Sequence, residues 1–168
     1  MSVDGVDQRV REVLAGLGPA YEFVPCDPAL ADTAQFCEAY GYSLGESANT
    51  ILVSGRGDPI RLAACVLLAD TRLDVNRTVR ARLGVKKASF ADPATTEALT
   101  GMAIGGVTPF ALPPGLPIWV DARVVERPRV VLGGGSRSWK VVGPPDLLLA
   151  LPDVEVVDGL AVAATSEA

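Results

Sequence analysis

The sequence predicts one mixed α/β domain, and three observations lead to this fold class. The chain has 168 residues, a length that suits a single domain. Hydrophobic residues make up 49% and charged residues 21%, which is typical of a folded protein rather than a disordered one. Short helical patterns alternate with short β-branched runs along the chain, without a repeat or a linker.

The N-terminal part is expected to contain two helices and a strand. A helix is predicted over residues 8–17, whose valines and leucines fall on one helical face. A short strand is predicted over 21–25. The second helix is predicted over 33–40, with Asp32 or Thr33 as its N-cap and a glycine directly after its last residue.

The middle of the chain predicts a strand hairpin followed by a helix. The apolar runs 49–54 and 60–68 flank the sequence GRGD, which is typical of two strands joined by a tight turn. Asp74 can cap a helix over 75–83, and a short strand is predicted over 86–90.

The C-terminal half is expected to contain short strands between irregular segments. Asp92 before Pro93 marks the start of a helix that ends at Thr100, and the stretch after it is too rich in Gly and Pro for regular structure. The remaining elements are strands over 118–121, 129–132, 139–142 and 154–157 and a short helix over 145–151. Residues 161–168 are expected to form a frayed tail.

The absence of histidine from the sequence excludes catalysis by an imidazole base and metal sites that need histidine ligands. Cys26, Cys37 and Cys65 are odd in number and widely spaced, so we expect buried reduced thiols rather than disulfides or a thiolate metal site. No metal and no cofactor is expected. Any chemistry must then use backbone amides, hydroxyls, side-chain amides, carboxylates, Arg or Lys.

The chain is expected to be cytoplasmic and to have no membrane partner. Its longest uncharged apolar run, 62–69, is far shorter than the roughly 20 residues of a membrane helix. The N-terminus is acidic and lacks the apolar region of a signal peptide.

Charge is distributed unevenly along the chain, which has a net charge of −5. Residues 61–87 and 123–140 are rich in Lys and Arg, whereas residues 1–58 are acidic. This pattern can produce a basic face that meets a phosphate backbone, or merely solvated cations on a helix and in loops.

Two glycine-rich segments, GGVTPF (105–110) and GGGSR (133–137), can present backbone N–H groups to an anion or a carbonyl. Neither fits a phosphate-loop or dinucleotide-binding pattern, and plain turns are the alternative.

The order of these segments resembles the YbaK/EbsC family, whose freestanding members are similar to the editing insertion of bacterial prolyl-tRNA synthetase. The resemblance is carried by NTILVSGRGD, TGMAIGGVTPFALP, VLGGGSR and PPDLLLAL. It covers residues 8–160 and implies one aminoacyl-tRNA deacylase-like domain of the α+β type. Helices would pack around a curved mixed or antiparallel sheet.

The resemblance implies hydrolysis, in trans, of the ester in a mischarged aminoacyl-tRNA that carries a small amino acid such as Ala, Ser or Cys. The substrate would be the aminoacylated 3′ end of tRNA, and an aminoacyl-tRNA synthetase is a candidate partner. Gly105 and Gly106 match the family's substrate-facing glycines, whose amides would hold the carbonyl or α-amino group. Thr108 and Pro109 would shape this loop.

The second glycine turn matches the family at Gly134, Gly135 and Arg137, and Arg137 would contact a phosphate or ribose. A solvated arginine is the alternative reading at that position. Asp121 matches the acid that ends the preceding strand, and capping of a turn is its alternative role.

Asn49 is the main departure from the family, because many members carry a lysine at this position that is expected to approach the tRNA end. Asparagine cannot pair with a phosphate as an ammonium group does. We place Asn49 among the catalytic candidates with Gly105 and Gly106. Its presence also favours an alternative function, a noncatalytic module that binds aminoacyl-tRNA or an aminoacyl-like ligand.

Overall fold

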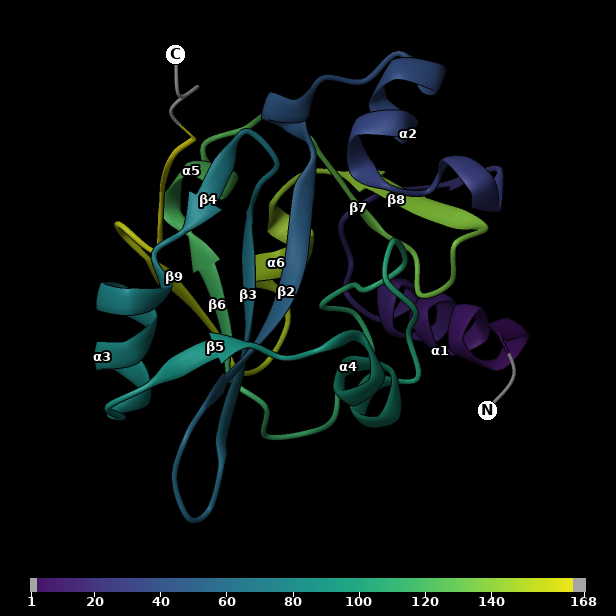
Figure 1. Ribbon diagram of the computed structural model, residues 1–168. Coiled ribbons are helices and arrows are strands. Elements are labelled where there is room, and N and C mark those ends of the chain that lie inside the picture. The colour runs from purple at the N-terminus through teal and green to yellow at the C-terminus, as the bar shows by residue number, and fades with distance from the viewer. Residues whose placement is uncertain (1–2, 165–168) are drawn as a thin grey trace.

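The central sheet is built on the antiparallel hairpin of β2 (Ala48–Gly55) and β3 (Arg61–Leu68), which projects beyond the rest of the molecule in Figure 1. The computed structural model describes residues 3–164. The sheet has five strands in the order β5-β2-β3-β6-β9, with β5 at Ala88–Phe90, β6 at Ile118–Asp121 and β9 at Val154–Val157. β5 pairs antiparallel to β2, whereas β6 and β9 run parallel to β3, so the sheet is mixed.

Two smaller sheets complete the fold and confirm the predicted mixed α/β class. One is antiparallel, in the order β1-β8-β7, with β1 at Glu22–Pro25, β7 at Val130–Gly133 and β8 at Trp139–Gly143. A parallel bridge between Ser47 and Val131 connects it to the start of β2. The other sheet pairs β4 (Thr71–Leu73) with β10 (Ala161–Ala163).

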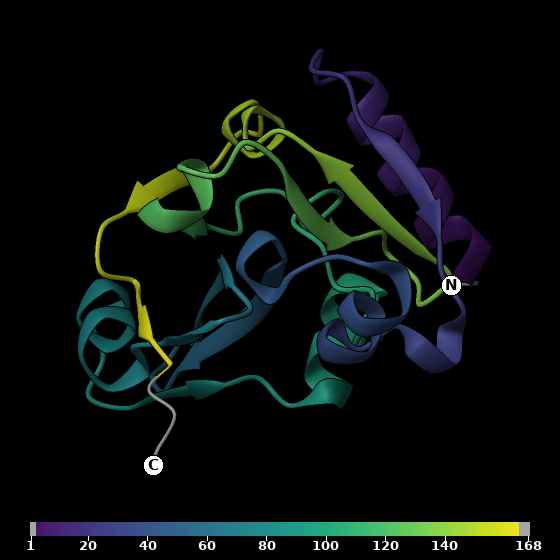
Figure 2. The ribbon, with the colours of Figure 1, turned by 90° about the horizontal axis from the view of Figure 1, so that it is seen from above.

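The helices are α1 (Val3–Ala15), α2 (Thr33–Tyr40), α3 (Arg80–Leu83), α4 (Pro93–Thr100), α5 (Ala122–Val125) and α6 (Asp146–Leu149). Figure 1 places α2 near one end of β2 and α4 lower along the same side of the sheet. Seen from above in Figure 2, α1 lies along β1, at the opposite end of the molecule from α3.

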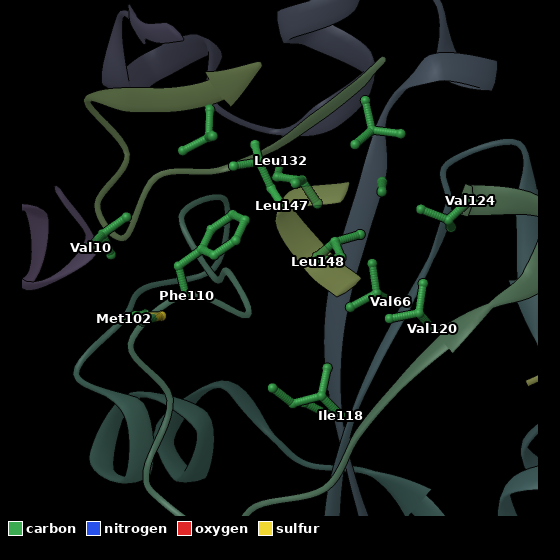
Figure 3. Packing of buried hydrophobic residues seen from close by; sticks show 14 of the residues in the cluster. Val10, Val66, Met102, Phe110, Ile118, Val120, Val124, Leu132, Leu147 and Leu148 are labelled. Atoms are coloured by element: carbon green, nitrogen blue, oxygen red, sulfur yellow. The ribbon is translucent and has the colours of Figure 1, made fainter. Parts of the chain in front are cut away.

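Buried side chains cover both faces of the central sheet. Ala64, Val66 and Leu68 of β3 belong to a large cluster on one face, and the alternate residues of β3 belong to a second cluster on the other. Figure 3 shows the large cluster, in which Leu148 of α6 lies near Val66 of the sheet, and Val10 of α1 lies on the far side of Phe110. β3 is therefore held from both sides and gives β2 a rigid support.

Several element boundaries differ from the prediction. α1 begins at Val3 rather than at residue 8, because the turn around Val6 also packs into the core. The expected helix 75–83 is a π-helical turn at Val75–Val79 followed by α3, and α5 was not expected.

The prediction of a frayed tail over 161–168 is wrong for its first residues. Residues 161–163 form β10, which pairs with β4, and Ala161 is 2% exposed because it belongs to the buried cluster that contains Leu73. The end of this expected tail, 165–168, lies outside the described residues.

Cys26, Cys37 and Cys65 are buried free thiols, as predicted. Burial raises the pKa of the Cys26 thiol and raises the pKa of Cys65 to about 12, so neither is a thiolate nucleophile near neutral pH. Among residues 3–164, no helix is both long and apolar enough to cross a membrane.

Candidate active site

A cavity of about 270 Å³ opens beside the part of β2 that pairs with β3 on one edge but has no partner strand on the other. β5 pairs with β2 only from Val53 to Gly55, and the preceding residues 48–52 line the cavity instead. The start of α2, the 104–107 loop, the end of β7 and Lys140 of β8 form the other walls. The cavity therefore lies between the central sheet and the β1-β8-β7 sheet.

The unpaired edge of β2 presents polar backbone groups to this cavity. Ala91 N–H donates to the Leu52 carbonyl at 2.9 Å, so this carbonyl points out of the hairpin on the β5 side. Strand alternation places the N–H and C=O of Thr50 on the same side. The Thr50 hydroxyl is buried and has no hydrogen-bond partner among the described residues. Thr50 thus offers a ligand several polar contacts.

Asn49 lines the cavity, as the sequence comparison with the family predicts for a pocket residue. Its side-chain Oδ1 accepts a hydrogen bond of 2.6 Å from the hydroxyl of Thr33, the first residue of α2. This bond fixes the amide group at the wall between β2 and α2. The side-chain NH₂ group donates to no described residue, which leaves two donors for a ligand.

The first glycine loop contributes Gly105 to the cavity wall, whereas Gly106 is buried behind it. Gly106 N–H donates to the Ala103 carbonyl at 2.9 Å, so this amide is already engaged within the loop. Gly105 N–H has no acceptor among the described residues and is the loop amide that remains for a ligand.

The two glycine turns touch each other, because Gly135 N–H donates to the Gly106 carbonyl at 2.8 Å. Gly133 lines the cavity, but Gly134 and Gly135 are buried outside its lining. Thr108 and Pro109 are also buried outside the lining, and the Thr108 hydroxyl has no partner among the described residues. These residues support the loop that carries Gly105.

Arg137 is a positioning residue at the cavity mouth rather than a free cation. Its Nη1 donates to the Ile104 carbonyl at 2.7 Å and to Asp32 Oδ1 at 3.0 Å, and its Nε donates to the Pro28 carbonyl at 2.9 Å. Ile104 and Asp32 line the cavity, so Arg137 ties two of its walls together. These bonds engage Nε and Nη1 within the protein, and the contact of Arg137 with a phosphate or ribose stays a prediction.

Asp121 takes the capping role and lies outside the cavity lining. Its carboxylate is 1% exposed, accepts from Arg123 N–H at 3.2 Å at the start of α5, and accepts from Ala161 N–H at 3.0 Å. The expected pocket contact is absent from its described surroundings, and the carboxylate instead connects β6, α5 and β10.

Lys140 is the cavity residue that sequence reasoning missed. The sequence shows it only as one cation of the Lys- and Arg-rich segment 123–140, yet it is 5% exposed. Its Nζ donates to the Ala31 carbonyl at 2.6 Å and to the Gly105 carbonyl at 2.8 Å. It forms no ion pair with a described carboxylate, and burial lowers its pKa from the ordinary 10.5. A lone lysine in the apolar strand Trp139–Gly143 was the available signal.

The cavity therefore combines an ammonium group, a free loop amide, a carboxamide and an unpaired hydroxyl. This donor set suits a carbonyl oxygen that gains negative charge. The described residues contain no cluster of acidic, cysteine or histidine side chains that could hold a metal ion.

Comparisons with known proteins identify the family to which the chain is similar. The sequence model of the family described as the aminoacyl-tRNA editing domain matches residues 27–151, which is most of the chain. The chain is similar to the Multifunctional Ser/Thr-tRNA deacylase ProXp-y of Escherichia coli strain K12, with 27% identity over 121 residues that cover 71% of each protein.

Two crystal structures share the fold over nearly their whole length. The hypothetical protein APE2540 has a TM-score of 0.80 and 26% identity, with coverage of 92% of this chain and 99% of that one. A proposed trans-editing enzyme for prolyl tRNA synthetase has a TM-score of 0.77 and 25% identity, with coverage of 91% and 95%.

Proposed function

Because this chain belongs to the aminoacyl-tRNA editing domain family, we propose that it is a deacylase that acts in trans on mischarged tRNA. Water adds to the ester carbonyl, the bond to the ribose oxygen breaks, and that oxygen leaves with a proton. The free amino acid and the tRNA are the products.

The observation that carries this proposal is Lys140 at the wall of the cavity, bound to the Gly105 carbonyl. An ammonium group has three donors, of which the Ala31 and Gly105 carbonyls use two. The third donor of Lys140 and the Gly105 amide stabilise the negative charge that develops on the carbonyl oxygen of the ester in the transition state. A positive charge is most effective for this in a buried, water-poor site.

The reaction needs no imidazole because an aminoacyl ester is already labile. A ribose hydroxyl of the substrate can position the attacking water, and the protein adds oriented donors. Each such donor can contribute about 2.7–4 kcal/mol when it faces developing charge. The composition of the cavity therefore fits a chain that lacks histidine.

The cavity favours a small, hydroxyl-bearing amino acid. Its volume of about 270 Å³ lies below the range of about 300–1,000 Å³ typical of pockets for drug-sized ligands. The free Thr50 hydroxyl and the Asn49 amide can bind a substrate hydroxyl. Because the similar Escherichia coli protein is named a Ser/Thr-tRNA deacylase, we propose serine or threonine as the amino acid.

The direct test is a panel of tRNAs charged with Ala, Ser, Thr, Cys or Pro, with loss of the ester measured over time. We expect the seryl or threonyl ester to disappear much faster with the protein than in buffer. An unchanged half-life for every member of the panel would overturn the proposal of an enzyme.

The alternative, a module that binds the ligand without cleaving it, is motivated by Asn49 and is tested by Asn49→Lys. This change breaks the bond to Thr33 and adds a second ammonium group to the cavity that already holds Lys140. We therefore expect lower ester hydrolysis in the variant, because two cations repel in a buried site. Asn49→Met, of similar length and uncharged, is the control. Activity that arises only in Asn49→Lys would show that the natural chain is a binder.

A further inference from the structure

Five exposed cations gather around the hairpin loop between β2 and β3, outside the cavity. We call this surface the basic groove, and it consists of Arg56, Arg61, Arg80, Lys86 and Lys87. Two adjoining hollows share Arg56, Lys86 and Lys87 in their lining. Asp58 is the one carboxylate among the described residues that line them.

Two charges of the basic groove are held by backbone carbonyls, which do not neutralise them. Arg61 Nη1 donates to the Leu83 carbonyl at 2.7 Å, and Arg80 Nη1 donates to the Lys86 carbonyl at 3.4 Å. None of the five side chains forms an ion pair with an acid among the described residues. In a chain with a net charge of −5, such an unpaired cluster creates a local positive potential that attracts a polyanion.

The basic groove and the cavity lie along the same edge of the central sheet. Lys87 directly precedes β5, and Ala91, which lines the cavity, directly follows it. At about 3.3 Å per residue, the distance along the strand from Lys87 to Ala91 is roughly 13 Å. Along β2, the path from Arg56 to Asn49 is roughly 23 Å by the same rise. Figure 1 shows β5 running from the hairpin side of the sheet toward α4.

An exposed aromatic ring lies between the two sites. Phe90, at the end of β5, is 56% exposed and directly precedes Ala91. Exposed aromatic side chains next to a basic groove are the elements that bind single-stranded nucleic acids, because bases stack on the ring while cations follow the phosphates.

We propose that the basic groove binds the phosphate backbone of the tRNA acceptor arm, with Phe90 in contact with the single-stranded 3′ end. This inference rests on the proposed function, which places the esterified 3′ terminus in the cavity. A strand that leaves the cavity along β5 then reaches the groove after several nucleotides. The groove would hold the backbone without reading its sequence, because phosphates carry no sequence information.

The test compares two substrates and two doubly charge-reversed variants. Lys86→Glu combined with Lys87→Glu removes two groove cations, and Arg72→Glu combined with Arg127→Glu makes the same charge change at exposed sites outside it. Each variant is assayed on charged full-length tRNA and on a short ester of the same amino acid with adenosine.

For the groove variant on tRNA we expect about a ten-fold higher KM at low salt with kcat unchanged. The slope of log KM against log salt should fall by roughly 1.4–1.8, the value for two lost phosphate contacts. Phe90→Ala should raise KM at least about five-fold. Hydrolysis of the short ester should stay unchanged in the two charge-reversed variants, since this ester does not reach the groove.

Equal KM values for tRNA in the groove and control variants would overturn the inference while leaving the deacylase proposal intact. If the natural protein hydrolyses neither substrate, the deacylase proposal fails instead. Fluorescence anisotropy with uncharged tRNA then decides the inference separately: weaker binding by the groove variant alone supports it, and unchanged binding contradicts it.

Discussion

Replacing Lys140 by methionine should lower kcat/KM for a charged tRNA at least about 100-fold, the loss that follows removal of one strong transition-state donor. Methionine has a similar length and fills the space, but it cannot donate to the carbonyls of Ala31 and Gly105. The Gly105 loop loses its connection to the segment before α2, and the cavity loses its buried charge. Single-turnover assays measure the effect on the chemical step.

A second expected result is a pH dependence of stability, which follows from the burial of the Lys140 ammonium group. Burial lowers the pKa of Lys140 below 10.5, so the folded protein binds fewer protons than the unfolded chain between the two pKa values. The free energy of unfolding of the natural protein, relative to Lys140→Met, should therefore rise with pH toward 10.5. Lys87→Met, the same change at an exposed lysine, is the control. A flat difference with intact activity would contradict our assignment.

Gly106→Ala should reduce the free energy of unfolding by about 1–3 kcal/mol, the cost of overpacking a closed site, and should also abolish most activity. A Cβ at this position would lie 2.6 Å from the carbonyl carbon and oxygen of Ser136 and 2.8 Å from the Gly135 carbonyl oxygen. These neighbours are backbone atoms and cannot rotate away. The two glycine turns must then separate, which displaces Gly105 from the cavity wall.

Gly16→Ala is the matched control for this substitution. A Cβ at Gly16 meets its nearest described atom, the Val13 carbonyl oxygen, at 3.6 Å, an ordinary contact. Thermal or denaturant unfolding should show a loss for Gly106→Ala and little change for Gly16→Ala. If both variants unfold like the natural protein, the contact between the turns is looser than described.

The elements with strong local signals were predictable from the sequence. Asp92 caps α4 through a 2.7 Å bond from Thr95 N–H, and Gly41 ends α2 with a φ of 80°. Such caps depend on neighbours within a few residues, and the sequence displays them directly. β10 was missed because its pairing with β4 depends on residues about 90 positions apart along the chain.

The site was predictable in outline but not in its donors. The family resemblance indicated Asn49 and Gly105, and both line the cavity. It could not show that Gly106 N–H is engaged by Ala103, or that Arg137 binds Asp32. Lys140 escaped because its two acceptors come from loops 109 and 35 residues away, and a strand pattern does not reveal which loops meet its side chains.

The bare edge of β2 has a consequence for self-association as well. A strand with unused N–H and C=O groups is normally a template on which another chain adds a strand, and this leads to aggregates. Here the unused edge groups of Thr50 stand inside a recess bordered by α2 and α4. An extended peptide cannot lie flat against them, whereas a compact acyl group can enter. This enclosure therefore protects the protein from templated fibre growth.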